Sequence, residues 1–380
     1  RVAASVCGVR ILIVGGGVLG TLHAWQAVER GHDVVQLERE PEARGASVRN
    51  FGLVWVGGRA TGAELDTALR ARRLWERIGE RVPGLGFRAN GSLTVVRTEA
   101  ELAVAQEVAA GAEAADRGYK LLGAAETREL NPALCGDFLG ALWCERDAAV
   151  EPRVAQPALR AELERSGRYT WRPGREVRHL TATGVVDDRG ERHDGDVVVF
   201  CTGAWTGGLV RELAGEPPVR KVRLQMAQTE PLGEPLTTSV ADGDSFRYYP
   251  AYRGPALATL EAGQPQGEIA QAHRMQLLLV QRLDGSLTIG DTHEYDEPFA
   301  FDVTEDPYEH LAEVAGALLG RPLPRIRRRW AGVYAQTTDT GRIVHRERVA
   351  DNAFLVTGPG GRGMTCSPAI AEDTAEELDL

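Results

Sequence analysis

A glycine-rich turn near the start of the chain constrains its fold more than any other feature. Residues 9–14 form a short apolar run typical of a buried parallel strand, and Gly15, Gly17 and Gly20 follow it in a G-x-G-x-x-G pattern. A helical pattern comes next, and a second apolar segment closes on Glu38. Strand, turn, helix, strand and terminal acid in this order predict a βαβ unit that binds a dinucleotide.

Each part of this unit has a physical task. Gly15 permits the tight turn, Gly17 lets the backbone approach a pyrophosphate, and Gly20 lets helix and strand pack closely. The free N–H groups of the helix N-terminus face the phosphates. Glu38 lies eighteen positions after Gly20 and can accept both hydroxyls of an adenosine ribose. An acid at this position disfavours NADP, but it leaves NAD and FAD open.

Three further segments favour FAD. The stretch RGASVRNFG at 44–52 is a polar, glycine-rich loop, where a plain NAD domain would continue into another strand and helix. The apolar strand within 195–209 ends in a Thr-Gly-Ala turn, so the backbone can approach the dinucleotide again. Within 352–378 a strand runs into a turn with four glycines and then a helix. The dipole at that helix N-terminus would stabilise the negative charge of a reduced flavin.

Composition places the chain among ordinary globular proteins, with 43% hydrophobic and 26% charged residues. Its 380 residues exceed what one core usually serves, so we expect two domains or one domain with an insertion. The net charge of −10 argues against nucleic acid and against a basic membrane surface, and no apolar run approaches the roughly 20 residues of a membrane span. Five scattered cysteines without metal-ligand spacing predict free thiols, no metal site and a cytoplasmic location.

These segments together resemble the FAD-dependent amine oxidoreductases related to D-amino-acid oxidase, glycine oxidase and sarcosine oxidase. The resemblance covers nearly the whole chain and is strongest at 10–52, 195–205 and 330–378. Within the family, RGASVRNFG, GDTHEY at 290–295 and GRGMT at 361–365 look like a subfamily associated with phosphonate breakdown.

The resemblance implies an α/β fold with two domains. One is a discontinuous, Rossmann-like FAD-binding domain, and the other is an α+β substrate domain built on a mostly antiparallel sheet. We expect the FAD-binding domain to comprise 1–85, 145–215 and 328–380. The substrate domain then comprises 86–144 and 216–327.

The implied activity is oxidation of the C–N bond of a small anionic amine, such as 2-aminoethylphosphonate or its N-methyl derivative. In such enzymes a hydride passes to flavin N5, the imine hydrolyses to an aldehyde and an amine, and O₂ reoxidises the flavin to give H₂O₂. The alternative is a secondary or D-amino acid oxidase of the glycine or sarcosine type, or a dehydrogenase with another electron acceptor. A tRNA-modifying flavoprotein, which the acidic balance disfavours, and a non-catalytic FAD scaffold are further classes. The oligomeric state stays open.

Four side chains are candidates for the chemistry. Arg362 lies in the glycine turn, at a position that resembles the one where sarcosine-oxidase-type enzymes keep a cation for the substrate carboxylate. Arg49 is expected to bind either the anionic substrate or the cofactor. His293 is a candidate to accept a proton or hold a phosphonate oxygen. Tyr334 matches a pocket position that is a tyrosine in sarcosine oxidase. An ordinary structural role is the alternative for each.

Two departures from the family pattern concern the cofactor. Gly332 stands where covalent-flavin members place a cysteine, so FAD is expected to bind non-covalently. Thr288 stands near the position of a lysine that helps O₂ react in some members, and neither Lys120 nor Lys221 falls near it. The reaction with oxygen would then need another cation, such as Arg49 or His293; otherwise the enzyme is a dehydrogenase that passes electrons to a different acceptor.

The expected cofactor contacts come from the segments described above. They are Gly15, Gly17, Val18, Leu19, Gly20, Glu38, Arg39, Gly45, Ala46, Ser47, Asn50, Phe51, Gly52, Val177, Thr202, Gly203, Trp205, Gly332, Gly358, Gly361, Arg362, Gly363, Met364 and Thr365. Further candidates for the substrate pocket are Gln225, Tyr248, Tyr249 and Tyr252.

Overall fold

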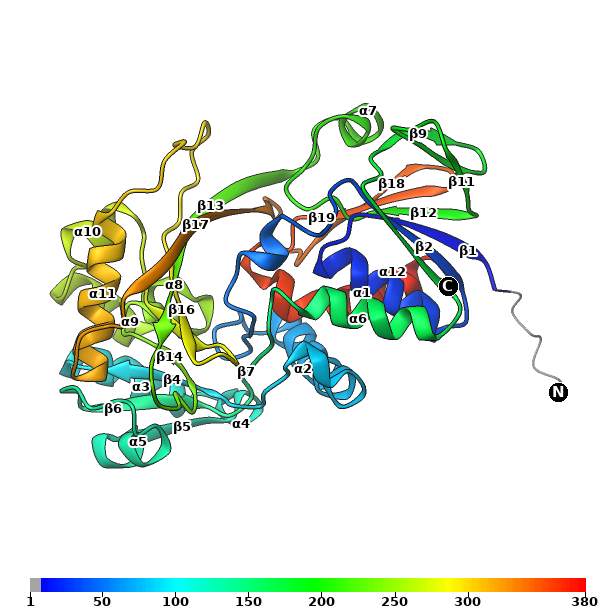
Figure 1. Cartoon of the computed structure of the whole chain (residues 1–380). Helices are drawn as coiled ribbons and strands as arrows, with labels where there is room; N and C mark the ends of the chain where they lie inside the picture. Colours follow the sequence, from blue (N-terminus) through cyan, green and yellow to red (C-terminus); the bar gives the residue numbers. More distant parts are fainter. Residues whose placement is uncertain (1–7) are drawn as a thin grey trace.

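Two large sheets organise the protein, one toward each end of an elongated molecule (Figure 1). The structure is a computed structural model that describes residues 8–380. The first seven residues, which include Cys7, lie outside the described residues. The other four cysteines are free thiols, as predicted: Cys135, Cys144, Cys201 and Cys366.

The first sheet has six strands in the order β18-β19-β12-β1-β2-β8. All neighbours are parallel except β18 and β19, and the central β1 is almost fully buried because helices and loops cover both of its faces. This parallel core confirms the predicted α/β fold with a Rossmann-like half. The strands are β1 (Arg10–Val14), β2 (Asp33–Glu38), β8 (Tyr169–Pro173), β12 (Val197–Phe200), β18 (His345–Ala350) and β19 (Ala353–Thr357).

Four helices pack around this sheet. The helix that follows β1 is buried over most of its surface because it packs on the sheet with the C-terminal helix beside it (Figure 1). A longer amphipathic helix packs on the C-terminal helix, and its Trp75 donates a hydrogen bond from Nε1 to the Met364 carbonyl at 2.9 Å. The helices are α1 (Val18–Glu29), α2 (Ala63–Arg81), α6 (Ala155–Arg165) and α12 (Gly363–Glu377).

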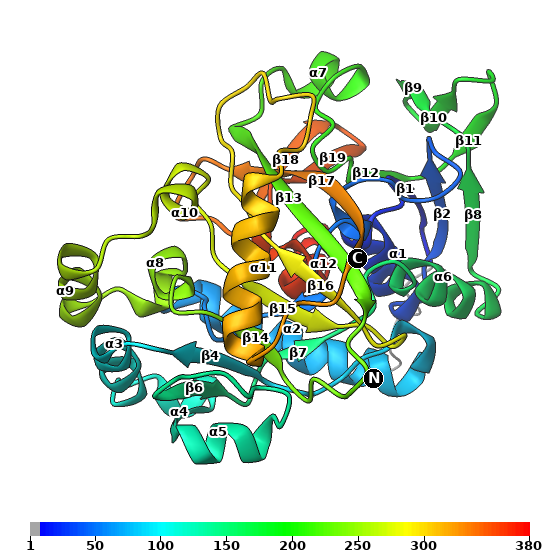
Figure 2. The same cartoon turned by 60° about the vertical axis from the view of Figure 1, so that its left-hand side comes forward.

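The second sheet has eight strands in the order β17-β13-β16-β15-β14-β4-β6-β5. Only β14 and β4 pair in parallel, so the sheet is mostly antiparallel, as predicted. The long helix α11 (Asp306–Leu319) crosses one face (Figure 2). The strands are β4 (Ser92–Val96), β5 (Tyr119–Gly123), β6 (Gly140–Cys144), β13 (Val219–Pro231), β14 (Ser239–Ala241), β15 (Leu278–Gln281), β16 (Ser286–Gly290) and β17 (Ile326–Thr337).

One strand crosses the expected division of the chain. β17 pairs with β13 along its whole length, whereas the expected boundary at residue 328 assigns most of β17 to the FAD-binding domain. We therefore propose to move this boundary beyond Thr337, and the other domain boundaries stay as predicted.

Smaller elements connect the two sheets. Two short strands pair beside α2, and a three-stranded antiparallel sheet lies at the edge of the parallel one. None of the helices in the described part of the chain combines the length and apolar character needed to cross a membrane. The remaining elements are β3 (Leu53–Val54), β7 (Ala148–Ala149), β9 (Val177–Thr181), β10 (Gly184–Asp187), β11 (Arg192–Asp194), α3 (Glu99–Ala109), α4 (Ala114–Arg117), α5 (Ala124–Leu130), α7 (Leu209–Ala214), α8 (Ser245–Tyr248), α9 (Pro255–Gly263) and α10 (Glu268–Ala272).

Candidate active site

A cavity of about 1080 Å³ runs between the two sheets. Its lining begins at the glycine turn after β1 and ends among aromatic residues such as Tyr248 of α8 and Tyr334 of β17 in the second sheet. Pockets for single small molecules commonly measure about 300–1,000 Å³, so this cavity has room for a large cofactor together with a substrate.

The glycine turn after β1 is shaped for close approach of a ligand to the backbone. Gly15 has φ +118°, and a Cβ there would lie 2.2 Å from the Cys201 carbonyl oxygen. A Cβ on Gly17 would lie 2.9 Å from Ser47 Oγ, where the turn faces the cavity. Gly20 does not line the cavity, because its Cα packs on the Gly15 carbonyl. The first two glycines therefore fit a phosphate cradle, and the third closes the helix onto the strand.

Glu38 ends β2 and lines the cavity on the same side. Its Oε2 accepts a hydrogen bond from the Gly16 N–H at 2.7 Å, and its Oε1 accepts one from the Glu40 N–H at 2.9 Å. A carboxylate has about four lone-pair sites, so these two bonds orient the side chain and leave capacity for ribose hydroxyls. The chemistry at this end of the cavity fits the adenosine half of FAD.

The loop at 44–52 is held by its own side chains. Asn50 donates from Nδ2 to two carbonyl groups of the loop and accepts the Gly52 N–H at 2.6 Å. Ser47 Oγ accepts a hydrogen bond at 2.9 Å from the N–H of Val18 at the start of α1. Arg49 reaches across to the second sheet and donates to the Ala331 carbonyl at 2.9 Å. This loop therefore joins the dinucleotide turn to the aromatic end of the cavity.

Arg362 lies in the second glycine turn and lines the cavity, but each of its three guanidinium nitrogens already has a partner in the protein. Nε donates to the Pro359 carbonyl at 3.1 Å and Nη2 to the Ile343 carbonyl at 3.1 Å. Nη1 forms an ion pair with Glu64 at 3.0 Å, and both side chains are about 15% exposed. A substrate anion at Arg362 would have to compete with the Glu64 carboxylate.

The other three predicted catalytic side chains line the same cavity. His293 is 2% exposed, and its ring stacks on Tyr248 with centroids 4.2 Å apart. Tyr334 points its hydroxyl toward the second glycine turn, since a Cβ on Gly361 would lie 3.6 Å from it. Burial raises the pKa of Tyr334, so this phenol stays protonated at neutral pH. A Cβ on Gly332 would lie 3.2 Å from the Cβ of Arg49, so the glycine makes room for that residue.

Six lysine and arginine residues on the cavity lining did not figure among the predicted site residues, among them Lys221, Arg220 and Arg253. Lys221 lines the cavity and forms an ion pair with Glu297 at 3.4 Å, whereas Thr288 does not line it. Arg220 lies over the Tyr295 ring at 4.4 Å. Arg253 is exposed and forms no ion pair with any residue that the structure describes. The spacing of charges in the sequence does not show that the β13 residues Arg220 and Lys221 and the loop residue Arg253 line one cavity.

Most of the expected cofactor residues line the cavity, and three do not. Gly52 has φ +70° and packs on the Val150 carbonyl, and Gly358 has φ +74° and packs on Thr337. These two glycines are therefore required by the turns of the backbone, and Gly20 by the close packing of helix on strand; none of the three lines the cavity. Among the further candidates, Tyr248 and Tyr249 line the cavity, whereas Gln225 and Tyr252 do not: Gln225 bonds to Thr304. The expected residues on the lining are Gly15, Gly17, Val18, Leu19, Glu38, Arg39, Gly45, Ala46, Ser47, Asn50, Phe51, Val177, Thr202, Gly203, Trp205, Gly332, Gly361, Arg362, Gly363, Met364 and Thr365.

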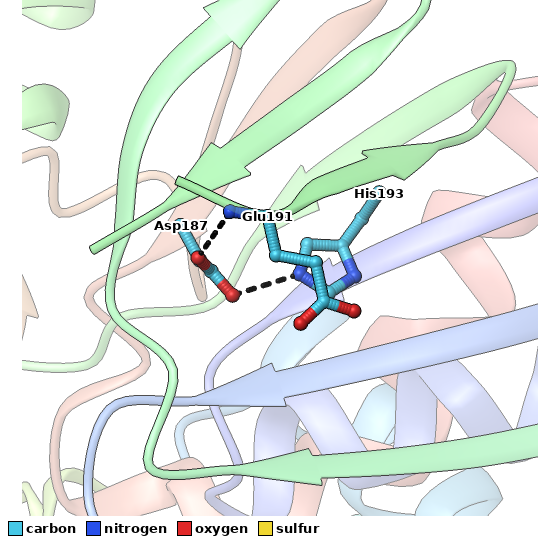
Figure 3. Close-up of side chains that lie close together, drawn as sticks. All are labelled: Asp187, Glu191 and His193. Atoms are coloured by element: carbon cyan, nitrogen blue, oxygen red, sulfur yellow. Dashed lines mark hydrogen bonds and ion pairs between the residues drawn. The ribbon is translucent and has the colours of Figure 1, made fainter. Parts of the chain in front are cut away.

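Away from the cavity, Asp187, Glu191 and His193 lie close together on the β10–β11 hairpin (Figure 3). Their potential ligand atoms are within 4.8 Å of one another. Arg175 already supplies a cation, with Nη1 at 2.7 Å from Asp187 and 2.6 Å from Glu191. The cluster is therefore an ion-pair network, and its geometry does not call for a metal ion.

Comparison with known proteins agrees with this architecture. The glycine oxidase of Pseudomonas aeruginosa is 26% identical over 382 residues, which cover 95% of this chain and 92% of that protein. The anaerobic glycerol-3-phosphate dehydrogenase subunit A1 of Haloferax volcanii is 29% identical over 52% of this chain, and the match spans only 37% of that relative's length. The crystal structure of glycine oxidase from Geobacillus kaustophilus has the same fold, with a TM-score of 0.76 at 20% identity over 98% of this chain and 95% of that one. Residues 10–377 match the DAO family, described as FAD dependent oxidoreductase, and the chain belongs to this family.

Proposed function

We propose that the protein oxidises the C–N bond of a small anionic amine. The observation that carries this proposal is the continuity of one cavity from the dinucleotide turn to an aromatic end with cations at its wall. Such a cavity holds FAD and a substrate side by side, and the cations favour a negatively charged substrate.

When bound, FAD supplies the two-electron acceptor for the C–H bond beside the amine nitrogen. The first glycine turn and Glu38 would hold its adenosine diphosphate half, and the second glycine turn at 358–363 would lie beside its ring. The protein's own contribution is to orient the substrate in a pocket with His293, Tyr248 and Tyr334 on its walls. Gly332 has no side chain that could bond to the flavin, which supports non-covalent binding.

The anion of the substrate is assigned to Arg253, which lines the same cavity as Lys221 and Arg220. A phosphonate carries up to two negative charges and favours more than one cation, so this set supports an aminoalkylphosphonate such as 2-aminoethylphosphonate or its N-methyl derivative. Because Glu64 already occupies Arg362, we assign that arginine to the shape of the glycine turn. Glycine, a secondary amino acid or a D-amino acid is the alternative substrate, as the glycine oxidase relative suggests.

The test is anaerobic bleaching of the flavin by a panel of amines. The panel contains 2-aminoethylphosphonate, its N-methyl derivative, glycine, sarcosine, D-alanine and the neutral propylamine. We expect the phosphonates to bleach the flavin fastest, and H₂O₂ production in air to identify O₂ as the acceptor. Bleaching by the amino acids alone selects the alternative, and no bleaching by any amine refutes the proposal.

Arginine variants test which side chain binds the anionic group of the substrate. Arg253→Gln should lower kcat/KM for the anionic amines about ten- to a hundredfold, because a charge-assisted hydrogen bond is lost, and should change little for propylamine. Arg44→Gln is the matched control, since Arg44 lines the cavity at the cofactor end. It should affect all amines alike. Equal losses on anionic and neutral amines in Arg253→Gln would contradict the assignment.

A further inference from the structure

We infer that Asp291, together with His293, is the site that holds the protonated nitrogen of the substrate and takes up its proton. This inference rests on the proposed function, because it concerns the amine end of the same substrate. It assigns a second charged subsite, so that the protein binds a zwitterionic substrate by its anion at one end and by its ammonium group at the other.

Asp291 directly follows β16 and lines the cavity while only 5% exposed. Within residues 8–380, its Oδ1 is buried and has no hydrogen-bond partner. Its Oδ2 lies 3.7 Å from His293 Nε2, which is beyond hydrogen-bond distance. A buried carboxylate with an unpaired oxygen is costly, so its retention on a cavity wall points to a donor that arrives with a ligand.

His293 is oriented so that one ring nitrogen can take a proton. Its Nδ1 lies 2.9 Å from the Arg274 carbonyl oxygen. Because a carbonyl only accepts hydrogen bonds, Nδ1 carries the hydrogen, and Nε2 is left as an acceptor on the side of Asp291. The pair therefore presents two acceptors, Oδ1 or Oδ2 of Asp291 and Nε2 of His293, to a donor in the cavity.

The other groups that face Asp291 are neutral. They are the amide of Gln276 and the hydroxyls of four tyrosines, and all of these residues line the cavity: Tyr248, Tyr249, Tyr295 and Tyr334. Burial raises the pKa of Asp291, and no fixed cation among these groups offsets that effect. Aromatic rings around a carboxylate favour an ammonium ligand, because the ring faces add to its attraction. The Asp291 carboxylate and the surrounding aromatic rings therefore favour a protonated amine as the ligand.

The proton step needs no oxidant. An N–H bond of the substrate ammonium breaks, a new bond forms to an oxygen of Asp291 or to Nε2 of His293, and the electron pair stays on the substrate nitrogen. The product is a neutral amine, which is the form that can lose a hydride from the neighbouring carbon. The same pair thus recognises the cation and prepares it for oxidation.

The test uses the FAD-loaded enzyme and a pair of ligands that cannot be oxidised. In (2-amino-2-methylpropyl)phosphonate the carbon that bears the amine has no hydrogen, and (2,2-dimethylpropyl)phosphonate replaces the amine by a methyl group of similar size. Titration calorimetry and the flavin absorbance change give both affinities. We expect the wild type to prefer the amine about ten- to a hundredfold, and Asp291→Asn to lose most of this preference while it binds the isostere as before. A second pair, 2-aminoisobutyrate and pivalate, covers carboxylate substrates.

Calorimetry in two buffers with different ionisation enthalpies counts the protons exchanged on binding. The count should differ between the wild type and both Asp291→Asn and His293→Gln. Asp242→Asn is the matched control, because Asp242 is a buried aspartate of the same sheet region that bonds to the Leu277 N–H at 3.0 Å and does not line the cavity. FAD content and Tm verify that each variant is folded.

The outcomes separate this inference from the proposed function. If amines bleach the wild-type flavin but Asp291→Asn keeps the full preference for the amine ligand, only the inference is overturned. A wild type that binds the two members of both pairs equally overturns it as well. If no amine bleaches the flavin, the proposed function itself falls.

Discussion

At the scale of single residues, His23 is a buried titratable group outside the cavity. It lies on α1, is 5% exposed and donates from Nδ1 to the Leu19 carbonyl at 2.7 Å. Its Nε2 has no partner among the residues that the structure describes. Burial lowers the pKa of His23 from 6.5 to about 4, so the folded protein keeps this histidine neutral under conditions where the unfolded chain is protonated.

This difference makes stability depend on pH. Between pH 6.5 and 4 the unfolded chain binds a proton that the folded protein excludes, so the free energy of unfolding falls as the pH falls. We expect a loss of about 2 kcal/mol between pH 7.5 and pH 5 from this group alone. Urea midpoints at the two pH values measure it. His23→Leu should remove about 2 kcal/mol of the difference, whereas His179→Leu, at an exposed position on β9, should leave it unchanged. Equal pH dependence in the two variants would exclude His23 as a cause.

At the scale of elements, the sequence predicts best where a pattern is local. The strand, turn, helix and strand from residue 9 to Glu38 form as predicted, because a buried strand and a tight glycine turn each leave a continuous signature. Gly52 and Gly358 were expected to contact the cofactor, but neither lines the cavity, and both lie in turns where the backbone has a positive φ. A pattern identifies a glycine that the backbone requires, but it does not say whether the reason is a ligand or a turn.

The β10–β11 hairpin offers a prediction at this scale. Asp187 accepts four hydrogen bonds, two from backbone N–H groups and one each from His193 and Arg175. Burial opposes the charge of Asp187, but the bonds from His193 and Arg175 outweigh it and hold the pKa of Asp187 below its ordinary value. The stabilisation is therefore present above about pH 4 and declines as the pH falls further.

Asp187→Asn should lower the free energy of unfolding by about 1.5–3 kcal/mol at pH 7, because charged hydrogen bonds are lost. EDTA and added Zn²⁺ should leave the wild-type Tm unchanged, since Arg175 occupies the cation position. Thermal melts with and without each reagent measure both effects. A wild-type Tm that drops in EDTA, together with an Asp187→Asn Tm that does not, would instead indicate a bound metal ion.

At the scale of the whole molecule, the site joins segments that are far apart in the sequence. The family resemblance brought His293 and Tyr334 to the predicted pocket, because motifs just after β16 and on β17 carried them. The pairing of Arg362 with Glu64 spans 298 residues and had no local signal. Asp291 and Lys221 were not identified as site residues from the sequence, for a related reason. Whether a residue on or beside a strand faces a cavity depends on the register of the sheet and on the element packed opposite, and the pattern of one segment predicts neither.

Because both sheets line the cavity, FAD should stabilise the whole protein. A ligand that binds only the folded state adds about 2.7 kcal/mol when its free concentration is a hundredfold above Kd, so removal of FAD should lower the Tm. ADP should restore part of the loss, since it fills only the end of the cavity with the first glycine turn. Glu38→Ala should abolish most of the ADP effect, because the ribose hydroxyls lose a charged acceptor.

Differential scanning calorimetry of the FAD-free protein, with and without ADP, measures these shifts. Glu42→Gln is a suitable control, since Glu42 is exposed a few residues further along and pairs with Arg160 at 2.5 Å. It should leave the ADP effect intact. If ADP raises the Tm of Glu38→Ala as much as that of the wild type, Glu38 does not hold the ribose, and its bonds to the N–H groups of Gly16 and Glu40 serve only to shape the turn.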